Sequence, residues 1–351
     1  MRTHVLLRPR SNREHAQQIY AGFTELARRK EIVLEQAPCE PDHGLFVEAV
    51  VNGGQTILFD LEDFDTINDE RYASTDVYFK RSYRTVQANR HPKLRPLGLN
   101  YEVHVRGMSL QAFRRARFYP NLQKHMMLRA MGTGHLLGVP HTPTAANLRE
   151  PPAALEPRVI FMTRLWGPDE LMKTRLRPDE IETLNEQRAG CVRALRREFG
   201  KRFTGGVAHT PFALQNYGDV LLPDPAIGTR KRFVQLLKGH PIAVQTLGLH
   251  GSDGFKLAEY AACSRAIVTE KRIMEVPGCF RPRTTYLDFA TPDECVAQVR
   301  RLFLDADLRM AMMRASGSYF EAYASPAALV RNALTRAAAI PTDIGYAAAA
   351  A

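Results

Sequence analysis

The residues from Gly248 to Glu270 combine types and spacing that could bind a phosphorylated ligand. An apolar run leads into a turn from Gly251 to Gly254, and a helical segment follows. The glycines let backbone N–H groups come close to a ligand, and Ser252 or Asp253 could cap the first helical turn. The helix N-terminus would then offer hydrogen-bond donors and partial positive charge to a phosphate group.

A carboxylate follows one to two turns inside the expected helix. Glu259 lies there among the small residues Ala258, Ala261 and Ala262. Small neighbours let the helix approach a sheet closely and leave the carboxylate as the conspicuous polar group. Such a group could accept two hydrogen bonds from the hydroxyls of a ribose. A short buried strand over 266–269 completes a strand–turn–helix–strand unit of an α/β fold.

The glycine turn, the run G-F-K-L-A-E-Y-A-A and the strand A-I-V-T-E together resemble a known site. It is the nucleotide-sugar site in the C-terminal domain of glycosyltransferases of the GT-B fold, in particular the group 1-like members. In that family a glutamate of the matching helix holds the donor's ribose, and the preceding turn holds its diphosphate. The resemblance implies these roles for Glu259 and for the segment from His250 to Gly254, over roughly the last third of the chain.

The same resemblance implies further properties of the donor site. In GT-B enzymes the loop after the first strand of the C-terminal domain often brings a basic residue toward the donor's phosphates. Arg164 or Lys173 is the match here by position. GT-B enzymes generally need no essential divalent ion, so the resemblance implies no metal and no cofactor beyond the nucleotide-diphosphate sugar, which is a substrate.

Composition and charge narrow the class of protein. The 351 residues exceed what one core usually supports, so two domains are expected. Hydrophobic residues at 45% and charged residues at 24% are typical of a globular protein. The net charge of +11 would suit nucleic acid, an anionic membrane or a phosphorylated substrate. Because the arginines are spread along the chain, apart from a cluster at 114–117, we do not expect nucleic-acid binding.

Cysteine usage and hydropathy indicate the compartment. The chain has 5 cysteines without C-x-x-C spacing, which favours reduced thiols over a disulfide framework or a zinc site. It begins almost directly with a strand, without an apolar signal segment, and has no run as long as a membrane span. We therefore expect a cytoplasmic protein whose contact with a membrane, if any, is peripheral and at its inner face.

The first half of the chain shows the rhythm of an α/β sheet. A strand over 3–8, an amphipathic helix over 12–29 and a strand over 31–35 suggest a doubly wound sheet. Two further strands flank Asn52-Gly53, which favours a tight hairpin turn. The other expected strands of this half span 76–79 and 93–99.

Acidic residues crowd the end of the second hairpin strand. Asp60 or Asp63 could face a cleft between domains and act as a general base or hold an acceptor hydroxyl. They could instead solvate a loop, and a Mg²⁺ site is the less favoured variant. His104, which follows the strand over 93–99, is a third candidate base because histidine titrates near neutrality. A structural histidine is the plainer alternative.

Basic residues follow the next strand. Lys80 and Arg81 come directly after the strand over 76–79. Ligands of open α/β sheets bind beyond the carboxyl ends of strands, so these cations would suit an anionic ligand. A solvated basic loop is the alternative. The basic helical segment over 109–131 could likewise meet anionic lipid or a lipid-phosphate acceptor, or form an ordinary solvated face.

A proline-rich stretch over 140–157 reads as the linker between two domains. The second half then restarts with strands over 158–163, 205–208, 219–222, 242–246 and 284–289, and helices over 178–199, 228–239, 308–323 and 326–339. Thr291, Pro292 and Glu294 predict another helix start with a capping box. We expect two Rossmann-like domains around a cleft: 1–155 on the acceptor side and 156–325 on the donor side. Residues 326–340 would be a helix that braces the first domain, and 341–351 a tail.

These observations favour a glycosyltransferase that moves a sugar from a nucleotide-diphosphate donor to a hydroxyl of a glycan or lipid-linked acceptor, in bacterial surface polysaccharide or glycoconjugate synthesis. Whether it inverts or retains the anomeric centre stays open. A nucleotide-sugar epimerase of the same fold would turn over the donor without an acceptor. A basic nucleic-acid-binding or scaffold protein would show steeply salt-dependent binding.

Overall fold

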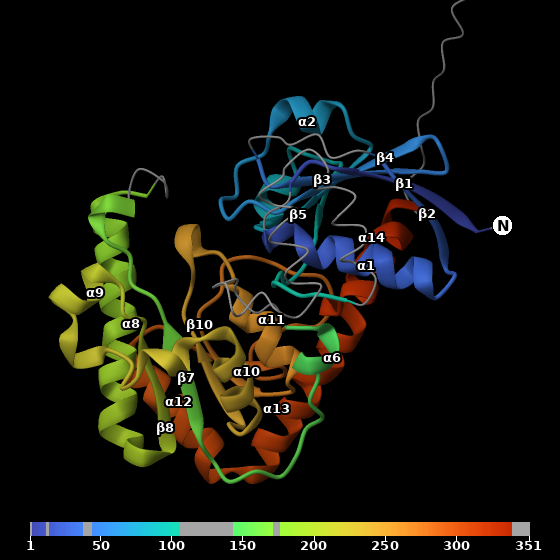
Figure 1. Cartoon of the computed structure of the whole chain (residues 1–351). Coiled ribbons are helices and arrows are strands. Elements are labelled where there is room, and N and C mark those ends of the chain that lie inside the picture. The colour runs from blue at the N-terminus through green and yellow to red at the C-terminus, as the bar shows by residue number, and fades with distance from the viewer. Residues whose placement is uncertain (1, 12–13, 38–43, 106–142, 171–175, 339–351) are drawn as a thin grey trace, which may run out of the picture.

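The structure, a computed structural model, describes residues 2–11, 14–37, 44–105, 143–170 and 176–338. Two α/β domains lie one above the other in Figure 1, the blue-to-cyan N-terminal domain at the top and the green-to-red C-terminal domain below. Each is built on its own sheet, with helices packed against it. This arrangement confirms the predicted fold class of two Rossmann-like domains; the exact domain boundaries stay a prediction.

The N-terminal sheet has six strands in the order β2-β1-β3-β4-β5-β6. β1 pairs in parallel with β2, whereas β3 is antiparallel to both β1 and β4. The turn between β3 and β4 has positive φ at Asn52 (50°) and Gly53 (73°), as expected for this dipeptide in a tight hairpin. The strands are β1 (Thr3–Pro9), β2 (Ile32–Gln36), β3 (Phe46–Val51), β4 (Gln55–Asp60), β5 (Val77–Lys80) and β6 (Leu94–Pro96).

The helices of this domain are shorter than the sequence pattern suggested. The predicted helix over 12–29 is a 3-10 turn, η1 (Glu14–Ala16), followed by α1 (Gln17–Arg28). Ile19, Phe23 and Leu26 of α1 are buried against the sheet. The remaining described helices of this half are α2 (Asp69–Ala73) and α3 (Thr85–Ala88).

The C-terminal sheet is parallel throughout, with five strands in the order β11-β10-β9-β7-β8. The order therefore reverses between β7 and β9, which makes the gap beyond their carboxyl ends a topological switch point. The predicted strand over 219–222 is wrong, because Gly218–Val220 forms a 3-10 turn and Leu221 makes only an isolated bridge to Val207. The strands are β7 (Val159–Thr163), β8 (Phe203–Val207), β9 (Ile242–Gln245), β10 (Ala266–Glu270) and β11 (Tyr286–Phe289).

Helices cover both faces of this sheet (Figure 1). The longer ones are α8 (Pro178–Phe199), α10 (Arg230–Lys238), α11 (Phe255–Ala262), α12 (Pro292–Leu304), α13 (Ala306–Tyr319) and α14 (Pro326–Ala338). Shorter ones are α6 (Ala145–Leu148), α9 (Pro211–Asn216), the 3-10 turns η4 (Pro168–Glu170), η5 (Gly200–Arg202), η6 (Gly218–Val220), η7 (Pro225–Gly228) and η8 (Leu249–Gly251), and the π-helical turn η9 (Phe320–Ala324).

The start of α12 follows its sequence signals closely. The Thr291 side chain accepts a hydrogen bond from the Glu294 backbone N–H at 3.2 Å, which confirms Thr291 as the N-cap. The Glu294 carboxylate accepts from the backbone N–H of Ala290 at 2.7 Å rather than from that of the cap itself. The reciprocal bond of the predicted capping box is thus shifted by one residue.

The last helix crosses back to the N-terminal domain. In Figure 1 the red α14 lies beside the blue α1. A Cβ on Gly22 of α1 would come within 2.3 Å of the Pro326 carbonyl oxygen, so the two backbones nearly touch there. The Gln18 side chain also donates to the carbonyl of Ala324 at 2.8 Å. A single apolar core runs through α1, α11 and α14, joining the two domains.

Two expectations fall outside what the structure describes. The basic segment over 109–131 and the tail over 341–351 lie beyond the described residues. Within the described part of the chain, no helix is both long enough and apolar enough to cross a bilayer.

Candidate functional site

A cavity of about 500 Å³ lies between the two domains, at the switch point of the C-terminal sheet. Its floor is formed by residues at the carboxyl ends of β7 and β9, among them Thr163 and Gln245. The N-terminal domain contributes His15, Asp63 and Arg81 to the opposite wall. This is the place where open α/β sheets bind ligands.

The lining of this cleft is strongly cationic. Among the described residues, the lining includes one carboxylate, that of Asp63, beside five basic side chains: Arg81, Arg164, Arg188, Arg230 and Lys256. Arg81, Arg164 and Arg230 are each paired with a carboxylate. Arg188 and Lys256, in contrast, bond only to carbonyl and hydroxyl oxygens in the described part of the chain, so positive charge remains in excess and favours an anion. The cleft is therefore suited to a ligand with several negative charges.

Lys256 reaches the cleft from the first turn of α11. Its ammonium group donates to the carbonyl of Met162 in β7 at 2.7 Å. Burial lowers the pKa of Lys256 to about 8. An anion bound next to this group would offset the desolvation of the charge and favour the protonated form.

Arg188, from the middle of α8, ties together the two loops that form the switch point. Its guanidinium donates to the carbonyls of Arg164 at 2.5 Å and Leu247 at 2.7 Å, and to the Thr246 hydroxyl at 3.3 Å. Burial lowers its pKa to about 10, so it stays charged at neutral pH. With its donors directed at loop oxygens, Arg188 fixes the shape of the cleft.

The turn predicted to hold a diphosphate forms one edge of the cleft. His250 (φ 57°) and Gly251 (φ 69°) adopt left-handed conformations, and the Gly248 N–H donates to the Ser252 carbonyl at 2.8 Å. Ser252 and Gly254 line the cavity. The predicted cap at Ser252 or Asp253 is wrong, because Gly254 is the N-cap of α11 and no side chain caps it.

Asp253 serves a different purpose in this turn. Its carboxylate accepts two hydrogen bonds from Arg272, at 2.8 and 2.6 Å. Its carbonyl accepts from Arg81 of the N-terminal domain at 2.7 Å. Arg272 and Arg81 hold Asp253 from two sides, so the turn is fixed to both domains. Because the Asp253 carboxylate is bound to Arg272, it does not cap α11, and the amides at the start of this helix have no capping side chain.

Glu259, the predicted ribose ligand, is buried in α11 and forms an ion pair with Arg230. Arg230 lines the cleft and Glu259 lies behind it. The second carboxylate oxygen, Oε2, has no hydrogen-bond partner in the described part of the chain. An unsatisfied buried acceptor is costly, so this oxygen is available for a hydrogen bond from a ligand or a water.

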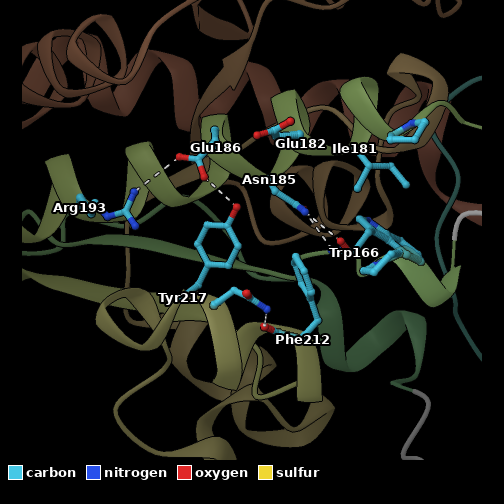
Figure 2. Close-up of a pocket in the computed structure, with 11 residues that line it drawn as sticks. Trp166, Ile181, Glu182, Asn185, Glu186, Arg193, Phe212 and Tyr217 are labelled. Atoms are coloured by element: carbon cyan, nitrogen blue, oxygen red, sulfur yellow. Dashed lines mark hydrogen bonds and ion pairs between the residues drawn. The ribbon is translucent and has the colours of Figure 1, made fainter.

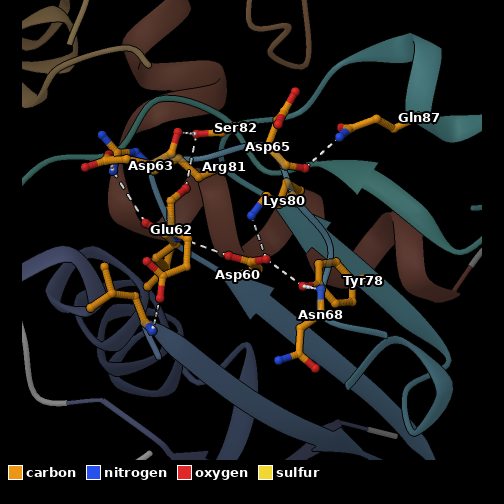
Figure 3. A network of polar contacts seen from close by, with 12 residues as sticks. Asp60, Glu62, Asp63, Asp65, Asn68, Tyr78, Lys80, Arg81, Ser82 and Gln87 are labelled. Atoms are coloured by element: carbon orange, nitrogen blue, oxygen red, sulfur yellow. Dashed lines mark hydrogen bonds and ion pairs between the residues drawn. The ribbon is translucent and has the colours of Figure 1, made fainter. Parts of the chain in front are cut away.

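Asp60 does not reach the cleft. Its carboxylate is buried at the end of β4, where it accepts from the Tyr78 hydroxyl at 2.5 Å and from Lys80 Nζ at 2.7 Å (Figure 3). Burial, together with this carboxylate, raises the pKa of Tyr78. The structure therefore corrects two expectations. Asp60 is buried and does not face the cleft as a base, and Lys80 pairs with Asp60 inside the domain instead of facing an anionic ligand.

Asp63 is the predicted acid that does line the cleft. It pairs with Arg81 at 2.5 Å and its side chain is 31% exposed (Figure 3). His104 instead lies in a bridge with Thr144 and is not among the described residues that line the cleft. Sequence order placed both residues near strand ends, but only Asp63 faces the opposite domain.

Of the other residues predicted to contact the donor, only some lie at the cleft. Arg164 lines the cleft, with its guanidinium 4.3 Å from the ring of Trp166 and paired with Glu170. His250 packs edge-on against Phe64, at 5.9 Å between ring centroids. Lys173 lies outside the described residues. Within the described ranges, no group of three or more His, Cys, Asp or Glu side chains is arranged to hold a metal ion.

The sequence reasoning missed four cleft residues. His15 follows β1, the position where a ligand contact is expected in such a sheet, and its ring lies 4.7 Å from that of Phe255 across the domain interface. Lys256 lies within the G-F-K-L-A-E run itself. Arg230 begins a helix after a glycine-containing turn, which is a weak signal. Nothing local distinguishes Arg188 from the other arginines of α8.

Residues 188–335 match the model of a protein family described as glycosyl transferase-like. The match contains the turn, Glu259, Arg230 and Lys256. It confirms the glycosyltransferase resemblance stated from the sequence, and with it the class of enzyme. No curated protein matches the sequence of the chain.

Several solved structures are similar at low identity. A glycosyltransferase from Rickettsia africae is 12% identical with a TM-score of 0.41, covering 93% of this chain and 82% of that one. Anabaena Alr3699/HepE in complex with UDP-glucose is 8% identical with a TM-score of 0.38, covering 96% and 100%. A putative UDP-N-acetylglucosamine 2-epimerase from Listeria monocytogenes is 14% identical with a TM-score of 0.40, covering 94% and 93%. Similarity this low does not assign a donor or an acceptor.

Proposed function

We propose that this glycosyltransferase moves a sugar from a nucleotide-diphosphate donor to a hydroxyl of a glycan or lipid-linked acceptor, without an essential metal or cofactor. The observation that carries the proposal is the cationic cleft at the switch point, next to the uncapped start of α11. Such a cleft offers fixed positive charge where a diphosphate leaving group would gain negative charge.

The diphosphate would lie against the amides at the start of α11 and the ammonium group of Lys256. Helix amides and the helix dipole favour a phosphate at this position. Arg164, whose side chain is 47% exposed, would join them by exchanging its partner Glu170 for the ligand. Together these groups would take the role that a divalent ion has in metal-dependent transferases.

The ribose would lie against Arg230 and Glu259. The free Oε2 of Glu259 supports a hydrogen bond from a ribose hydroxyl. Because Arg230 lies between this acid and the open cleft, binding would require its side chain to shift. The ribose role of Glu259 is thus shared with the arginine that covers it.

An inverting mechanism would also need a base from the N-terminal domain. Asp63 and His15 both line the cleft from that side. Asp63 would have to weaken its bond to Arg81 before accepting a proton. The acceptor would approach from the same side, as the predicted division into donor and acceptor domains requires.

We further propose a role in polysaccharide or glycoconjugate synthesis, in the cytoplasm and in peripheral contact with the membrane. The support is the net charge of +11 together with the basic, aromatic-rich sequence over 109–131. Anionic lipid attracts such segments, and the attraction weakens with salt. Co-sedimentation with vesicles containing phosphatidylglycerol, with and without added salt, tests this.

A nucleotide screen tests the central proposal. One of UDP, GDP, CDP and TDP should raise the unfolding temperature, since a ligand at a hundred times its Kd stabilises by about 2.7 kcal/mol. The matching donor sugar should then be incubated alone and with glycan or lipid-linked acceptors. Release of nucleotide that requires an acceptor supports transfer. Turnover of donor alone to an isomeric donor would support an epimerase, and the absence of any nucleotide effect would overturn the proposal.

A further inference from the structure

A second cavity, of about 390 Å³, lies in the C-terminal domain and has Trp166 in its lining (Figure 2). It opens between α8 and α9. Its base is formed by the buried side chains of Ile181 and Asn185. Trp166, Phe212 and Tyr217 contribute aromatic rings to its lining, and Glu182, Glu186 and Asn216 contribute polar side chains. We call it the aromatic pocket.

The walls of the aromatic pocket are held in place before any ligand binds. Asn185 accepts from the backbone N–H of Trp166 at 3.0 Å and donates to its carbonyl at 2.8 Å. The Tyr217 hydroxyl donates to Glu186 at 2.7 Å (Figure 2). Burial and this carboxylate raise the pKa of Tyr217 to about 12, so the hydroxyl stays a donor. A preformed pocket spends little binding energy on ordering its side chains.

The chemistry of the lining suits a saccharide. Aromatic faces are flat apolar surfaces against which the C–H faces of a sugar ring can pack. Carboxylates and amides next to such surfaces accept and donate hydrogen bonds to hydroxyl groups. Pockets of this kind, with apolar walls and a few placed polar groups, are typical small-molecule sites.

The charge of the lining selects against anions. Arg193 is the basic residue among the described lining residues. Its Nε and Nη2 bond to the carboxylate of Asp219 at 2.6 and 3.2 Å, and Glu186 lies 3.8 Å from its guanidinium. Glu182 forms no ion pair with any residue that the structure describes. Two further acids at the start of α8, Asp179 and Glu180, lie in the adjoining hollow, where they share Arg177 as a partner at 3.2 and 3.7 Å. A phosphate or uronate would meet net negative charge here, in contrast to the cationic cleft.

Trp166 connects the two sites, because it lines both the aromatic pocket and the cleft between the domains. We propose that the aromatic pocket binds an uncharged saccharide unit of the acceptor or product glycan, away from the bond being formed. This inference rests on the proposed transferase function. A second contact of this kind raises the effective concentration of a chain at the cleft without adding contacts at the reacting hydroxyl.

The chain offers a direct probe, since Trp166 is its single tryptophan. Intrinsic fluorescence of the full chain would be titrated first with the nucleotide found by the screen, then with chitotriose and maltotriose, and with trigalacturonate as an anionic trimer. Saturable quenching or enhancement by a neutral trimer is expected, at least tenfold stronger in affinity than any response to trigalacturonate. Equal responses to neutral and anionic trimers would overturn the proposal.

Variants locate the binding site. Phe212→Ala and Tyr217→Ala should each weaken the neutral trimer about tenfold or more, the usual scale for removing an aromatic anchor. Leu214→Ala is the matched control, because this residue of α9 is 53% exposed and does not line the pocket. Tyr217→Phe keeps the ring and guards against misfolding of the alanine variant. Tyr217→Phe should therefore bind the neutral trimer nearly as well as the original protein, and unchanged trimer affinity in folded Phe212→Ala and Tyr217→Ala would overturn the proposal.

The two hypotheses fail in different ways. If the nucleotide binds and neither neutral trimer does, the aromatic pocket is not a saccharide site and the transferase proposal stands. If a trimer binds in the pocket but no nucleotide binds anywhere, the saccharide site stands and the donor site falls. With an active acceptor series, the Phe212→Ala variant should raise the KM of long acceptors and leave that of the shortest acceptor unchanged.

Discussion

Lys256 and Glu259 lie three residues apart on α11, and each is a charged group with a partner on another element; Glu259 is buried and Lys256 is partly buried. Lys256 faces the open cleft and Glu259 lies behind Arg230. The desolvation of both charges is costly, and a bound nucleotide would offset part of that cost by supplying opposite charge or hydroxyl donors. Their contributions to binding can be separated by pH and by ligand chemistry.

The charge of Lys256 predicts a pH dependence. With a pKa of about 8 in the free protein, the ammonium form dominates below pH 7 and is lost above pH 8. A bound diphosphate favours this form, so affinity for the nucleotide should fall between pH 7 and 9, by at most about tenfold per unit. Lys256→Met should bind more weakly at pH 7 and lack this slope. Parallel pH curves for the two proteins would contradict the role.

The ribose role of Glu259 predicts a ligand-specific loss. For the original protein, removing the 2′-hydroxyl from the nucleotide should weaken binding several-fold, since it leaves a buried acceptor unpaired. In Glu259→Gln, removing the 2′-hydroxyl should reduce the affinity much less. The effects of the substitution and of the missing hydroxyl on the binding free energy are then non-additive in a double-mutant cycle. Isothermal titration with ribo- and deoxyribonucleotides measures this. Full additivity would place the ribose elsewhere.

At the scale of elements, the close contact of α1 with α14 fastens the end of the chain to its beginning. Gly22 permits this contact because any side chain there would meet the backbone of Pro326. Arg331 of α14 also forms an ion pair with Glu31, which follows α1, at 2.7 Å. The pair is exposed and contributes little, so most of the stability at this seam comes from packing.

Gly22→Ala should therefore destabilise the protein, by about 1–3 kcal/mol, the usual cost of overpacking. Gly54→Ala is the control, since a Cβ at Gly54 would meet nothing within 4 Å. Urea denaturation measures both. The helix propensity of alanine alone would predict a gain at Gly22, so a stabilised variant would show that α1 and α14 separate readily.

At the scale of the whole molecule, Arg81 connects the two domains at the cleft. Its guanidinium bonds to Asp63 of its own domain and to the carbonyl of Asp253 in the opposite one. The Glu275 carboxylate adds a second link, accepting from the backbone N–H of Thr85 at 2.9 Å. The position of the turn at 250–254 is thus set in part by the N-terminal domain.

Arg81→Lys should keep the charge but lose this bridge, because an ammonium group lacks the two-pronged geometry of a guanidinium. We expect about tenfold weaker nucleotide binding. Arg84→Lys is the control, since Arg84 makes an exposed pair with Asp65. If both variants bind the nucleotide as the original does, the turn is held without help from the N-terminal domain.

Local chemistry made much of this protein predictable from its sequence. Short apolar runs marked most of the strands and helical apolar spacing marked the closing helices. Asn52-Gly53 marked a hairpin, and Thr291 marked a helix start. The glycine turn before α11 was recognisable for the same reason. Such signals depend on residues within a few positions of one another, so they are present before the chain folds.

Partners distant in sequence were decided by the tertiary structure. The pairing of β4 with β5 sets Asp60 opposite Lys80, and this register turned a predicted base into a buried ion pair. The packing of α10 beside α11 set Arg230 over Glu259, and the strand order brought Arg188 to the switch point. A charge shows in the sequence, but whether it meets a ligand or another side chain depends on contacts between distant elements.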